Sequence, residues 1–168
     1  MPDNVYLGNP NLKKANTPIE FTQEQIYEFM RCKEDPVYFA NNYIKIVSLD
    51  EGLTQFHPYH FQEKLINNFH ENRFNICKMP RQTGKSTTVV SYLLHYAVFN
   101  ASVNIGILAN KAATARELLG RLQTAYENLP KWMQQGIIAW NKGSLELENG
   151  SKILAASTSA SAVRGMSF

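Results

Sequence analysis

The residues best suited to chemistry in this sequence lie in one short run, Pro80 to Thr87. Its second half, Gly84-Lys85-Ser86, matches the end of the G-x-x-x-x-G-K-[ST] pattern of phosphate-binding loops. The first glycine of that pattern is missing, because Met79 stands five places before Gly84. The match is partial, so the interpretation depends on the elements on either side of the run.

A loop of this type binds phosphate with its backbone and with a few side chains. Successive N–H groups at a helix N-terminus form a concavity for phosphate oxygens. Lys85 would pair with the β- and γ-phosphates of a nucleotide, and the Ser86 hydroxyl would ligate the Mg²⁺ ion that bridges them. Arg81 adds a second cation for the γ-phosphate. The alternative is a Gly-Lys-Ser turn that only caps an ordinary helix.

The flanking sequence contains the elements that such a loop requires. Residues 74–77 are a short apolar run of strand type. From Ser86 to Phe99 the apolar residues fall on one face of a helix, namely Val89, Val90, Leu93, Leu94, Ala97 and Val98. Strand, loop and helix therefore follow one another in the order of a phosphate-binding site.

The rest of the chain alternates between helical and strand-like patterns. Residues 59–70 favour a helix, residues 103–109 favour a buried strand, and Asn110 can cap a helix that ends at Pro130. Three short strand-like runs follow, at 137–140, 144–148 and 152–156. Asn149-Gly150 between the last two is a strong hairpin signal. This alternation predicts an α/β fold with a parallel sheet covered by helices on both faces.

Before the loop, the sequence predicts a separate N-terminal part. Residues 1–20 contain three prolines and a glycine among polar residues, which predicts an extended arm. Thr22 and Gln25 form a capping-box pattern, and Asp35-Pro36 is a second helix start. Gly52 to Pro58 is expected to be a connection. The predicted organisation is an arm at 1–20, a helical prefix at 21–58 and a partial nucleotide-binding core at 59–168.

The composition indicates which kind of partner and which cellular compartment suit this chain. Net charge is only +3, but residues 73–121 contain seven bases and one acid, which suits a polyanion such as nucleotide or DNA. Several of these bases could simply solvate helix faces. The two cysteines are 45 residues apart, which suggests reduced thiols in a cytosolic protein. No N-terminal signal region is present, and no run approaches the ~18 apolar residues that span a bilayer.

An acid that ATP hydrolysis needs is missing. P-loop enzymes hold Mg²⁺ through an acid on a second strand and also need a residue that positions the attacking water. All three aspartates precede the loop, and no residue after Lys85 is an aspartate. Glu146 and Glu148 alternate with leucines, so they are expected on a solvated strand face. We therefore expect a fragment cut before the acidic strand, one that binds ATP without hydrolysing it.

Two further residues are candidates for contact with nucleotide or nucleic acid. The amide of Gln62, near the start of its helix, can donate and accept hydrogen bonds as an adenine edge requires. From the residues alone, an exposed helix glutamine is the favoured interpretation. Arg164, in a polar C-terminal segment, could face nucleotide or nucleic acid, or simply be an exposed loop arginine.

Several motifs occur in one order along the chain, from Asn11-Leu12-Lys13-Lys14-Ala15-Asn16 to Val163-Arg164-Gly165. Between them stand Tyr38-Phe39-Ala40, Phe61-Gln62, Arg81-Gln82-Thr83-Gly84-Lys85-Ser86-Thr87, Gly106-Ile107-Leu108-Ala109, Trp140-Asn141-Lys142-Gly143-Ser144 and Asn149-Gly150-Ser151. In these motifs the chain resembles the large terminase subunit of T-even-type tailed bacteriophages and their marine relatives, from about Tyr6 to Phe168. A loop with Arg-Gln in place of a glycine-rich start is a common feature of that family.

The resemblance implies a RecA-like (ASCE) P-loop ATPase that drives double-stranded DNA into a procapsid, followed by a nuclease domain. It implies ATP and Mg²⁺ as cofactors, with Gln62 on adenine and Arg81 as the loop arginine that senses or triggers hydrolysis. The phosphate-binding residues would be Pro80, Arg81, Gln82, Thr83, Gly84, Lys85, Ser86 and Thr87, with Lys85 catalytic together with Arg81, and Ser86 on the metal.

The resemblance also bears on partners and on what lies beyond the site. A portal protein, a small terminase subunit and a homo-oligomeric ring are implied, at the procapsid in the host cytoplasm and without a membrane. The Walker B acid would follow Phe168 within about ten residues, the scale of one loop. A superfamily-2 helicase-like translocase and a nucleotide-binding module without turnover are the alternatives.

Overall fold

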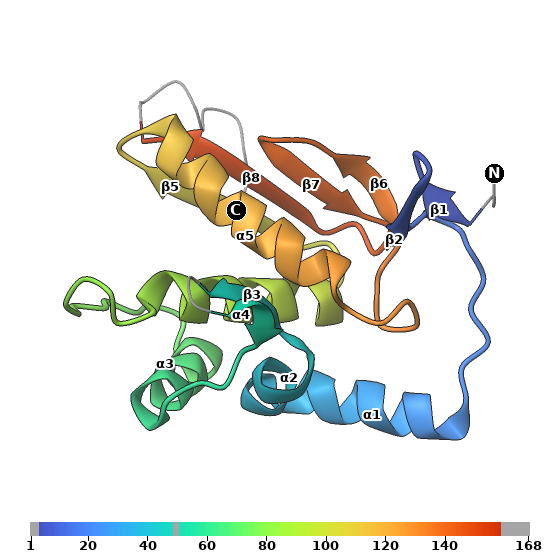
Figure 1. Cartoon of the computed structure of the whole chain (residues 1–168), viewed down its shortest axis with the longest axis horizontal. Coiled ribbons are helices and arrows are strands. Elements are labelled where there is room, and N and C mark those ends of the chain that lie inside the picture. Colours follow the sequence, from blue (N-terminus) through green and yellow to red (C-terminus); the bar gives the residue numbers. More distant parts are fainter. Residues whose placement is uncertain (1–3, 49–50, 159–168) are drawn as a thin grey trace.

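A four-stranded mixed sheet forms one side of the protein in the computed structural model, which describes residues 4–48 and 51–158 (Figure 1). Its strands lie in the order β5 (Asn104–Ala109), β8 (Lys152–Ser157), β7 (Ser144–Leu147) and β6 (Ile137–Trp140). β5 and β8 are parallel, whereas β8 with β7 and β7 with β6 are antiparallel. The three strand-like runs after residue 136 are therefore confirmed, and so is the α/β class.

The prediction of a parallel sheet covered on both faces is wrong for the described residues. Only the β5–β8 pair is parallel, because β6, β7 and β8 follow one another through short turns that reverse the chain. Along β5, Ile105 and Ile107 are buried, whereas the alternate residues Asn104, Gly106 and Leu108 are exposed. This alternation is typical of a sheet with one covered face. Helix α5 (Ala112–Glu127) packs against β5 and β8 on that face.

The other helices form further layers below α5 (Figure 1). Helix α4 (Lys85–Phe99) packs on α5, and α3 (His60–Glu71) packs on α4. The predicted apolar face of α4 is confirmed by Val90, Leu94, Ala97 and Val98, which are all buried. The start of α5 differs from the prediction, because its N-cap is Lys111 rather than Asn110. Burial of apolar surface between these layers supplies the main stabilisation of the core.

The two N-terminal helices begin at the predicted capping residues. Thr22 and Gln25 form both hydrogen bonds of a capping box at the start of α1 (Gln23–Glu34). Asp35 caps α2 (Pro36–Tyr43) by accepting a hydrogen bond from the Tyr38 N–H at 2.8 Å. These local signals were readable because each cap involves residues only three positions apart.

The N-terminal segment is not an extended arm as predicted. Strands β1 (Val5–Tyr6) and β2 (Asn9–Lys13) form a small antiparallel hairpin, and Lys14 forms a β-bridge with Ile137, the first residue of β6. Leu12 is buried in the core. A residue far along the chain attaches this segment: Gln134 accepts from the Lys13 N–H at 3.0 Å and donates to the Asn11 carbonyl at 2.9 Å.

Glu148 attaches the same segment, although the sequence placed it on a solvated strand face. Its carboxylate accepts hydrogen bonds from the N–H groups of Gly136 (2.6 Å) and Asn16 (2.9 Å), and lies 2.9 Å from the Lys13 Nζ. Partial burial raises the pKa of Glu148, but these hydrogen bonds and the charge of Lys13 outweigh it and lower the pKa overall. Glu148 is therefore a structural acid.

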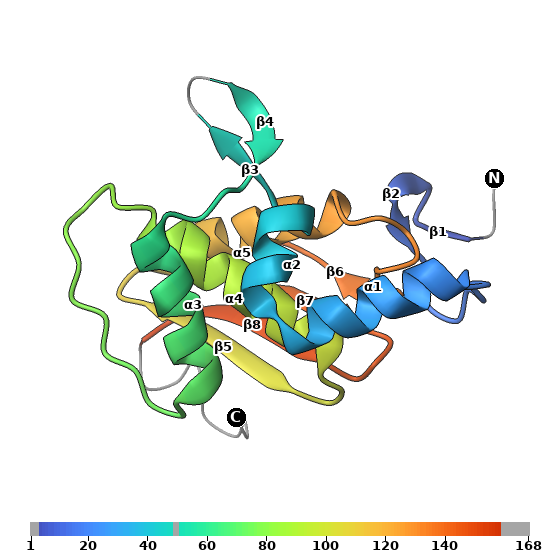
Figure 2. The same cartoon turned by 90° about the horizontal axis from the view of Figure 1, so that it is seen from below.

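A second hairpin lies within the predicted helical prefix. Strands β3 (Lys45–Ser48) and β4 (Gly52–Gln55) pair antiparallel and project away from the helices (Figure 2). Gly52 to Pro58 was predicted to be a connection, but its first four residues form β4. The Gln55 amide attaches the hairpin to the end of α2 by donating to the carbonyls of Asn41 (3.0 Å) and Ile44 (2.8 Å).

The predicted strand before the loop is not a strand in this structure. Residues 72–80 are irregular, and the side chains of Phe74 and Ile76 are 83 % and 100 % exposed. A strand needs a neighbour for its backbone N–H and C=O groups, and no strand of the described residues pairs with this segment. Among the helices of the described residues, none is long and apolar enough to cross a membrane.

Candidate functional site

The candidate loop turns sharply and ends directly at the N-terminus of α4. Thr83 Oγ1 donates a hydrogen bond to the Pro80 carbonyl at 3.1 Å, which closes the turn. Gln82 and Gly84 both have positive φ angles, of 63° and 72°. Gly84 is the N-cap of α4, and glycine adopts this left-handed conformation without steric cost. The loop therefore runs directly into the first turn of α4.

The first turn of α4 presents backbone donors that have no partner. No side chain caps the helix, and the N–H groups of Lys85, Ser86 and Thr87 donate to no atom of the described residues. The first internal bond of the helix runs from the Thr88 N–H to the Gly84 carbonyl at 3.0 Å. Unpaired N–H groups and the helix dipole together favour an anion at this position.

Cations stand beside these donors. Arg81 is exposed and Lys85 is half-buried, and neither forms an ion pair within the described residues. Ser86 is also half-buried, in the same first helical turn. Three or more His, Cys, Asp or Glu side chains that could hold a metal ion do not gather anywhere in the described part of the chain.

Gln62 connects α3 to the loop, and it is buried rather than exposed. Its side chain is 3 % exposed; Oε1 accepts from the Tyr59 N–H at 2.8 Å, and Nε2 donates to the Thr83 carbonyl at 3.2 Å. A Cβ atom at Gly84 would clash with the same amide nitrogen. The glycine therefore allows both the positive φ angle and the close approach of Gln62.

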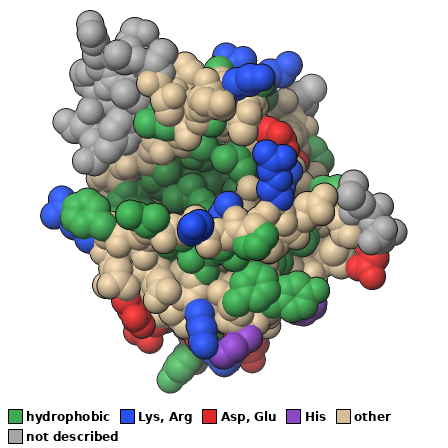
Figure 3. All heavy atoms as spheres, turned by 90° about the vertical axis from the view of Figure 1, so that its left-hand side faces the viewer, with side chains coloured by type: hydrophobic (Ala, Val, Ile, Leu, Met, Phe, Trp, Pro, Cys, Tyr) green, Lys and Arg blue, Asp and Glu red, His purple; other side chains and the backbone are tan. Residues whose placement is uncertain are grey.

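A pocket of about 550 Å³ lies between the loop, the start of α3 and the β3–β4 hairpin. That volume is in the range of small-ligand sites. Residues from three segments line it, including Thr54, Tyr59, Phe61, Gln62, Gln82 and Thr83. The rings of Tyr59 and Phe61 stack nearly parallel, with centroids 5.9 Å apart and planes at 9°. The side of the molecule on which the loop lies is hollowed, and hydrophobic side chains gather in the hollow (Figure 3).

The far end of α4 is fixed by polar side chains whose role could not be predicted from the sequence. The Asn149 Nδ2 donates to the carbonyls of Ala97 (2.9 Å) and Asn100 (3.1 Å), and Ser151 Oγ donates to the Asn100 carbonyl at 2.8 Å. These carbonyls are the unpaired acceptors that every helix leaves at its C-terminus. The Asn149-Gly150 turn signal located the residue but not its contact, because the contact spans about 50 positions.

Three of the four glutamates that follow the loop form ion pairs with basic side chains. Glu117 pairs with Arg121 at 2.7 Å, Glu146 with Lys152 at 2.9 Å, and Glu148 with Lys13. The structure thus brings together Gln62 and residues 80–87, and it gives these three glutamates basic partners. The predicted site residue Arg164 lies outside the described residues.

The loop, the helix that follows it and the strands up to β8 all fall in a region that matches a known family. A sequence model described as "Terminase large subunit, T4likevirus-type, N-terminal" matches residues 76–168. The match covers more than half of the 168-residue chain. It begins in the exposed segment before the loop and includes β5 to β8. The chain therefore belongs to the family of T4likevirus-type large terminase subunits, in their N-terminal region.

Proposed function

We propose that this chain is the ATP-binding part of a motor that packages phage DNA. Its family supports the packaging role. The observation that carries the nucleotide proposal is the set of three unpaired N–H groups at the start of α4, beside Arg81 and Lys85. Phosphate is the anion whose several oxygens match such a set of donors and cations.

In this proposal each residue of the site has a separate task. Backbone N–H groups of the loop and of α4 hold the phosphate oxygens, and Lys85 neutralises the β- and γ-phosphates. Ser86 contributes one oxygen ligand to Mg²⁺, and Arg81 reaches the γ-phosphate. The pocket between the loop and the β3–β4 hairpin accommodates the base, where the buried amide of Gln62 lies.

We further propose that these 168 residues bind ATP without turning it over. Hydrolysis needs an acid that completes the Mg²⁺ shell and a group that orients the attacking water. After Lys85 the sequence offers only four glutamates, and three of them form ion pairs with basic side chains. A turnover near ~1 s⁻¹, ordinary for an enzyme, would contradict this.

The finer parts of the motor follow from the family and are proposals for this chain. They are a RecA-like P-loop core, double-stranded DNA as the translocated substrate, and a portal protein and a small terminase subunit as partners. Action at the procapsid in the host cytoplasm, as a ring of identical subunits, belongs to the same proposal.

The test is Lys85→Ala, measured by calorimetric titration with Mg·ATP. We expect it to abolish measurable binding, because it removes the cation at the phosphates. Alanine is the best helix former, so α4 should persist, and circular dichroism checks that. Lys78→Ala, at an exposed lysine just ahead of the loop, is the matched control and should bind like the unmodified chain. Unchanged affinity in Lys85→Ala would refute the phosphate-binding loop.

A further inference from the structure

Two buried polar atoms on helix α4 have no hydrogen-bond partner among the described residues. They are Oγ of Ser91 and Nδ1 of His95, and each of the two residues is 1 % exposed. The residues are four positions apart in the helix, so they lie on the same face, one turn from each other. An unpaired buried polar group costs free energy, and nearly all such groups in proteins bond to protein or to ordered water. A bonding partner is therefore expected at this face of α4.

The contacts of the His95 ring determine which kind of partner it needs. Nε2 lies 2.8 Å from the Cys32 carbonyl, and a carbonyl oxygen can only accept a hydrogen bond. Burial lowers the pKa of His95 from 6.5 to about 4, so the ring is neutral near pH 7. The single proton of the neutral ring is then on Nε2, and Nδ1 carries a lone pair. Nδ1 therefore requires a hydrogen-bond donor.

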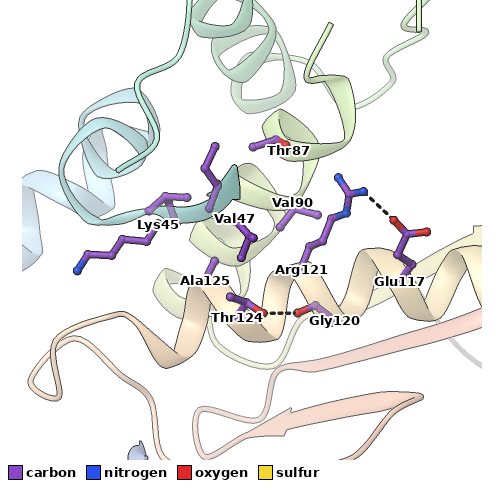
Figure 4. Close-up of a pocket in the computed structure, with 11 residues that line it drawn as sticks. Lys45, Val47, Thr87, Val90, Glu117, Gly120, Arg121, Thr124 and Ala125 are labelled. Carbon is purple, nitrogen blue, oxygen red and sulfur yellow. Dashed lines mark hydrogen bonds and ion pairs between the residues drawn. The ribbon is translucent and has the colours of Figure 1, made fainter. Parts of the chain in front are cut away.

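The Ser91 hydroxyl differs from two threonine hydroxyls within the helices. A hydroxyl inside a helix often donates to the carbonyl four residues earlier. Thr88 Oγ1 donates in this way to the Gly84 carbonyl at 3.0 Å. Thr124 Oγ1 donates to the Gly120 carbonyl at 3.1 Å (Figure 4). Ser91 makes no bond of this kind within the described residues, so its hydroxyl can still donate and accept.

We propose that one internal water molecule binds between Ser91 and His95. It donates a hydrogen bond to His95 Nδ1 and shares a second one with the Ser91 hydroxyl. Its remaining capacity suits a backbone carbonyl of the helix, which keeps a second lone pair. Buried waters typically make about three hydrogen bonds to groups that are otherwise unsatisfied. A metal ion suits the site less well, because the described part of the chain gathers no three His, Cys, Asp or Glu side chains that could hold one.

The water site lies where α4 meets the three helices that precede the loop. The His95 ring lies beside Phe39 of α2 and His70 of α3, with ring centroids 5.5 and 6.1 Å apart, and its Nε2 reaches the Cys32 carbonyl of α1. The bound water holds the ring in the orientation that makes these contacts. Because α4 also carries the candidate loop at its first turn, this water helps to fix the loop relative to α1, α2 and α3.

A crystal structure of the whole chain, at a resolution that shows ordered water, tests the proposal directly. We expect one water oxygen at about 2.7–3.2 Å from both Ser91 Oγ and His95 Nδ1. In crystals of Ser91→Ala the same water should remain on His95, because the smaller side chain leaves room for it.

Stability measurements distinguish a site that holds water from a dry void. Ser91→Val fills the space, excludes the water and leaves His95 Nδ1 without a donor. We therefore expect Ser91→Val to melt about 2–12 °C below Ser91→Ala, the range for one unsatisfied buried group in a chain of this size. In a dry void the larger side chain would improve packing and raise the melting temperature instead.

Two controls account for the other effects of valine. Thr124→Val and Thr124→Ala make the same comparison on α5, at a half-buried hydroxyl that already has a partner. The difference there measures helix preference, and the difference at Ser91 should exceed it. In a His95→Phe background no acceptor remains at the site, so Ser91→Val should melt no lower than Ser91→Ala. Circular dichroism records the melting and checks that each variant keeps its helices.

Four results would overturn the proposal. They are a crystal structure with no water oxygen within hydrogen-bond distance of Nδ1, a Ser91 hydroxyl that donates directly to Nδ1, a Ser91→Val variant that melts at or above Ser91→Ala, and a valine penalty that persists in the His95→Phe background. The crystallographic result decides the matter even if Ser91→Val does not fold. None of these measurements involves nucleotide, so the proposal can fail independently of ATP binding.

Discussion

At the scale of single residues, Gln62 makes two contacts whose effects on binding can be told apart by comparing two ligands. Its amide holds the Thr83 carbonyl of the loop, and it also lines the pocket proposed for the base. We expect Gln62→Ala to weaken the binding of inorganic triphosphate by about fivefold, which corresponds to the loss of one hydrogen bond near 1 kcal/mol. The affinity for ATP should fall further, because the contact with the base is lost as well.

Competition titrations with both ligands measure this difference. An equal loss for ATP and triphosphate would show that Gln62 acts only by positioning the loop. Unchanged triphosphate affinity would show instead that its bond to Thr83 is dispensable.

His95 makes the stability of the fold depend on pH. The ring is 1 % exposed and packs against Phe39 and Phe99, with Nε2 2.8 Å from the Cys32 carbonyl and no hydrogen-bond partner for Nδ1 among the described residues. Burial lowers the pKa of His95 from 6.5 to about 4. Between these values the unfolded chain binds a proton that the folded chain does not, so stability falls as pH decreases from 6.5 towards 4.

The loss over that whole window should be roughly 3 kcal/mol. Urea titrations at pH 7 and pH 5 should show a clear decrease in the unfolding free energy. In His95→Gln the decrease should largely disappear, since the amide cannot titrate and can still donate to the Cys32 carbonyl. An equal pH dependence in both proteins would assign the effect to other groups.

The residues of the loop could be identified from sequence, but their supporting contacts could not. Gly84, Lys85 and Ser86 form a local pattern, and the structure places them at the start of α4 as that pattern predicts. Gln62 and Glu148 were assigned to exposed surfaces, yet Gln62 donates to a residue 21 positions later and Glu148 accepts from a residue 132 positions earlier. A single sequence contains no signal for such pairs, because they arise only when the layers pack.

At the scale of elements, α4 is held at both ends by other parts of the fold. Gln62 from α3 holds the loop before its N-terminus, and the β7–β8 turn caps its C-terminus through Asn149 and Ser151. A ligand at the loop therefore acts on a helix whose other end is attached to the sheet.

Asn149→Ala should release the last turn of α4. Its side chain satisfies several helix carbonyls, so we expect a loss of about 1–3 kcal/mol in stability and faster hydrogen exchange at Val98, Phe99 and Asn100. Asn100→Ala removes a single exposed hydrogen bond to Tyr96 at the same helix end and is the control. Unaltered exchange in Asn149→Ala would mean that the turn does not hold the helix.

Elements with local signals were predicted, and those that need a distant partner were not. Capping residues located α1 and α2, and the Asn-Gly turn separated β7 from β8. The apolar run at 74–77 was predicted as a strand, but residue type alone does not make a strand without a hydrogen-bonded neighbour. Strands β1, β2, β3 and β4 were missed for the same reason, because each is only two to five residues long and depends on its hairpin partner.

At the scale of the whole molecule, the N-terminal segment is bonded to residues more than 100 positions later in the chain. Gln134, 2 % exposed, accepts from the Lys13 N–H and donates to the carbonyls of Asn11, Leu129 and Tyr126. The Gln134 amide therefore links the β1–β2 hairpin to the end of α5 and to the segment that leads into β6.

Gln134→Met keeps the volume of the side chain and removes every one of these bonds. We expect a loss of several kcal/mol, because the buried Lys13 N–H loses its side-chain acceptor and three carbonyls each lose a donor. Gln135→Met, which loses one bond to the Val98 carbonyl, should cost about 1 kcal/mol. Thermal melting compares the two, and similar melting temperatures would contradict the role of Gln134. Proteolysis after Lys13 or Lys14 should accelerate only in Gln134→Met.

The two cysteines give the protein a natural labelling site. Cys32 is fully buried, and burial, with the nearby Glu28 charge, raises its pKa to about 12, so its thiolate is scarcely available to an alkylating reagent. Cys77 is partly exposed, in the irregular segment seven residues before Gly84. A maleimide fluorophore should therefore attach at one known position in the unmutated chain, and its emission can report ligand arrival at the loop in real time.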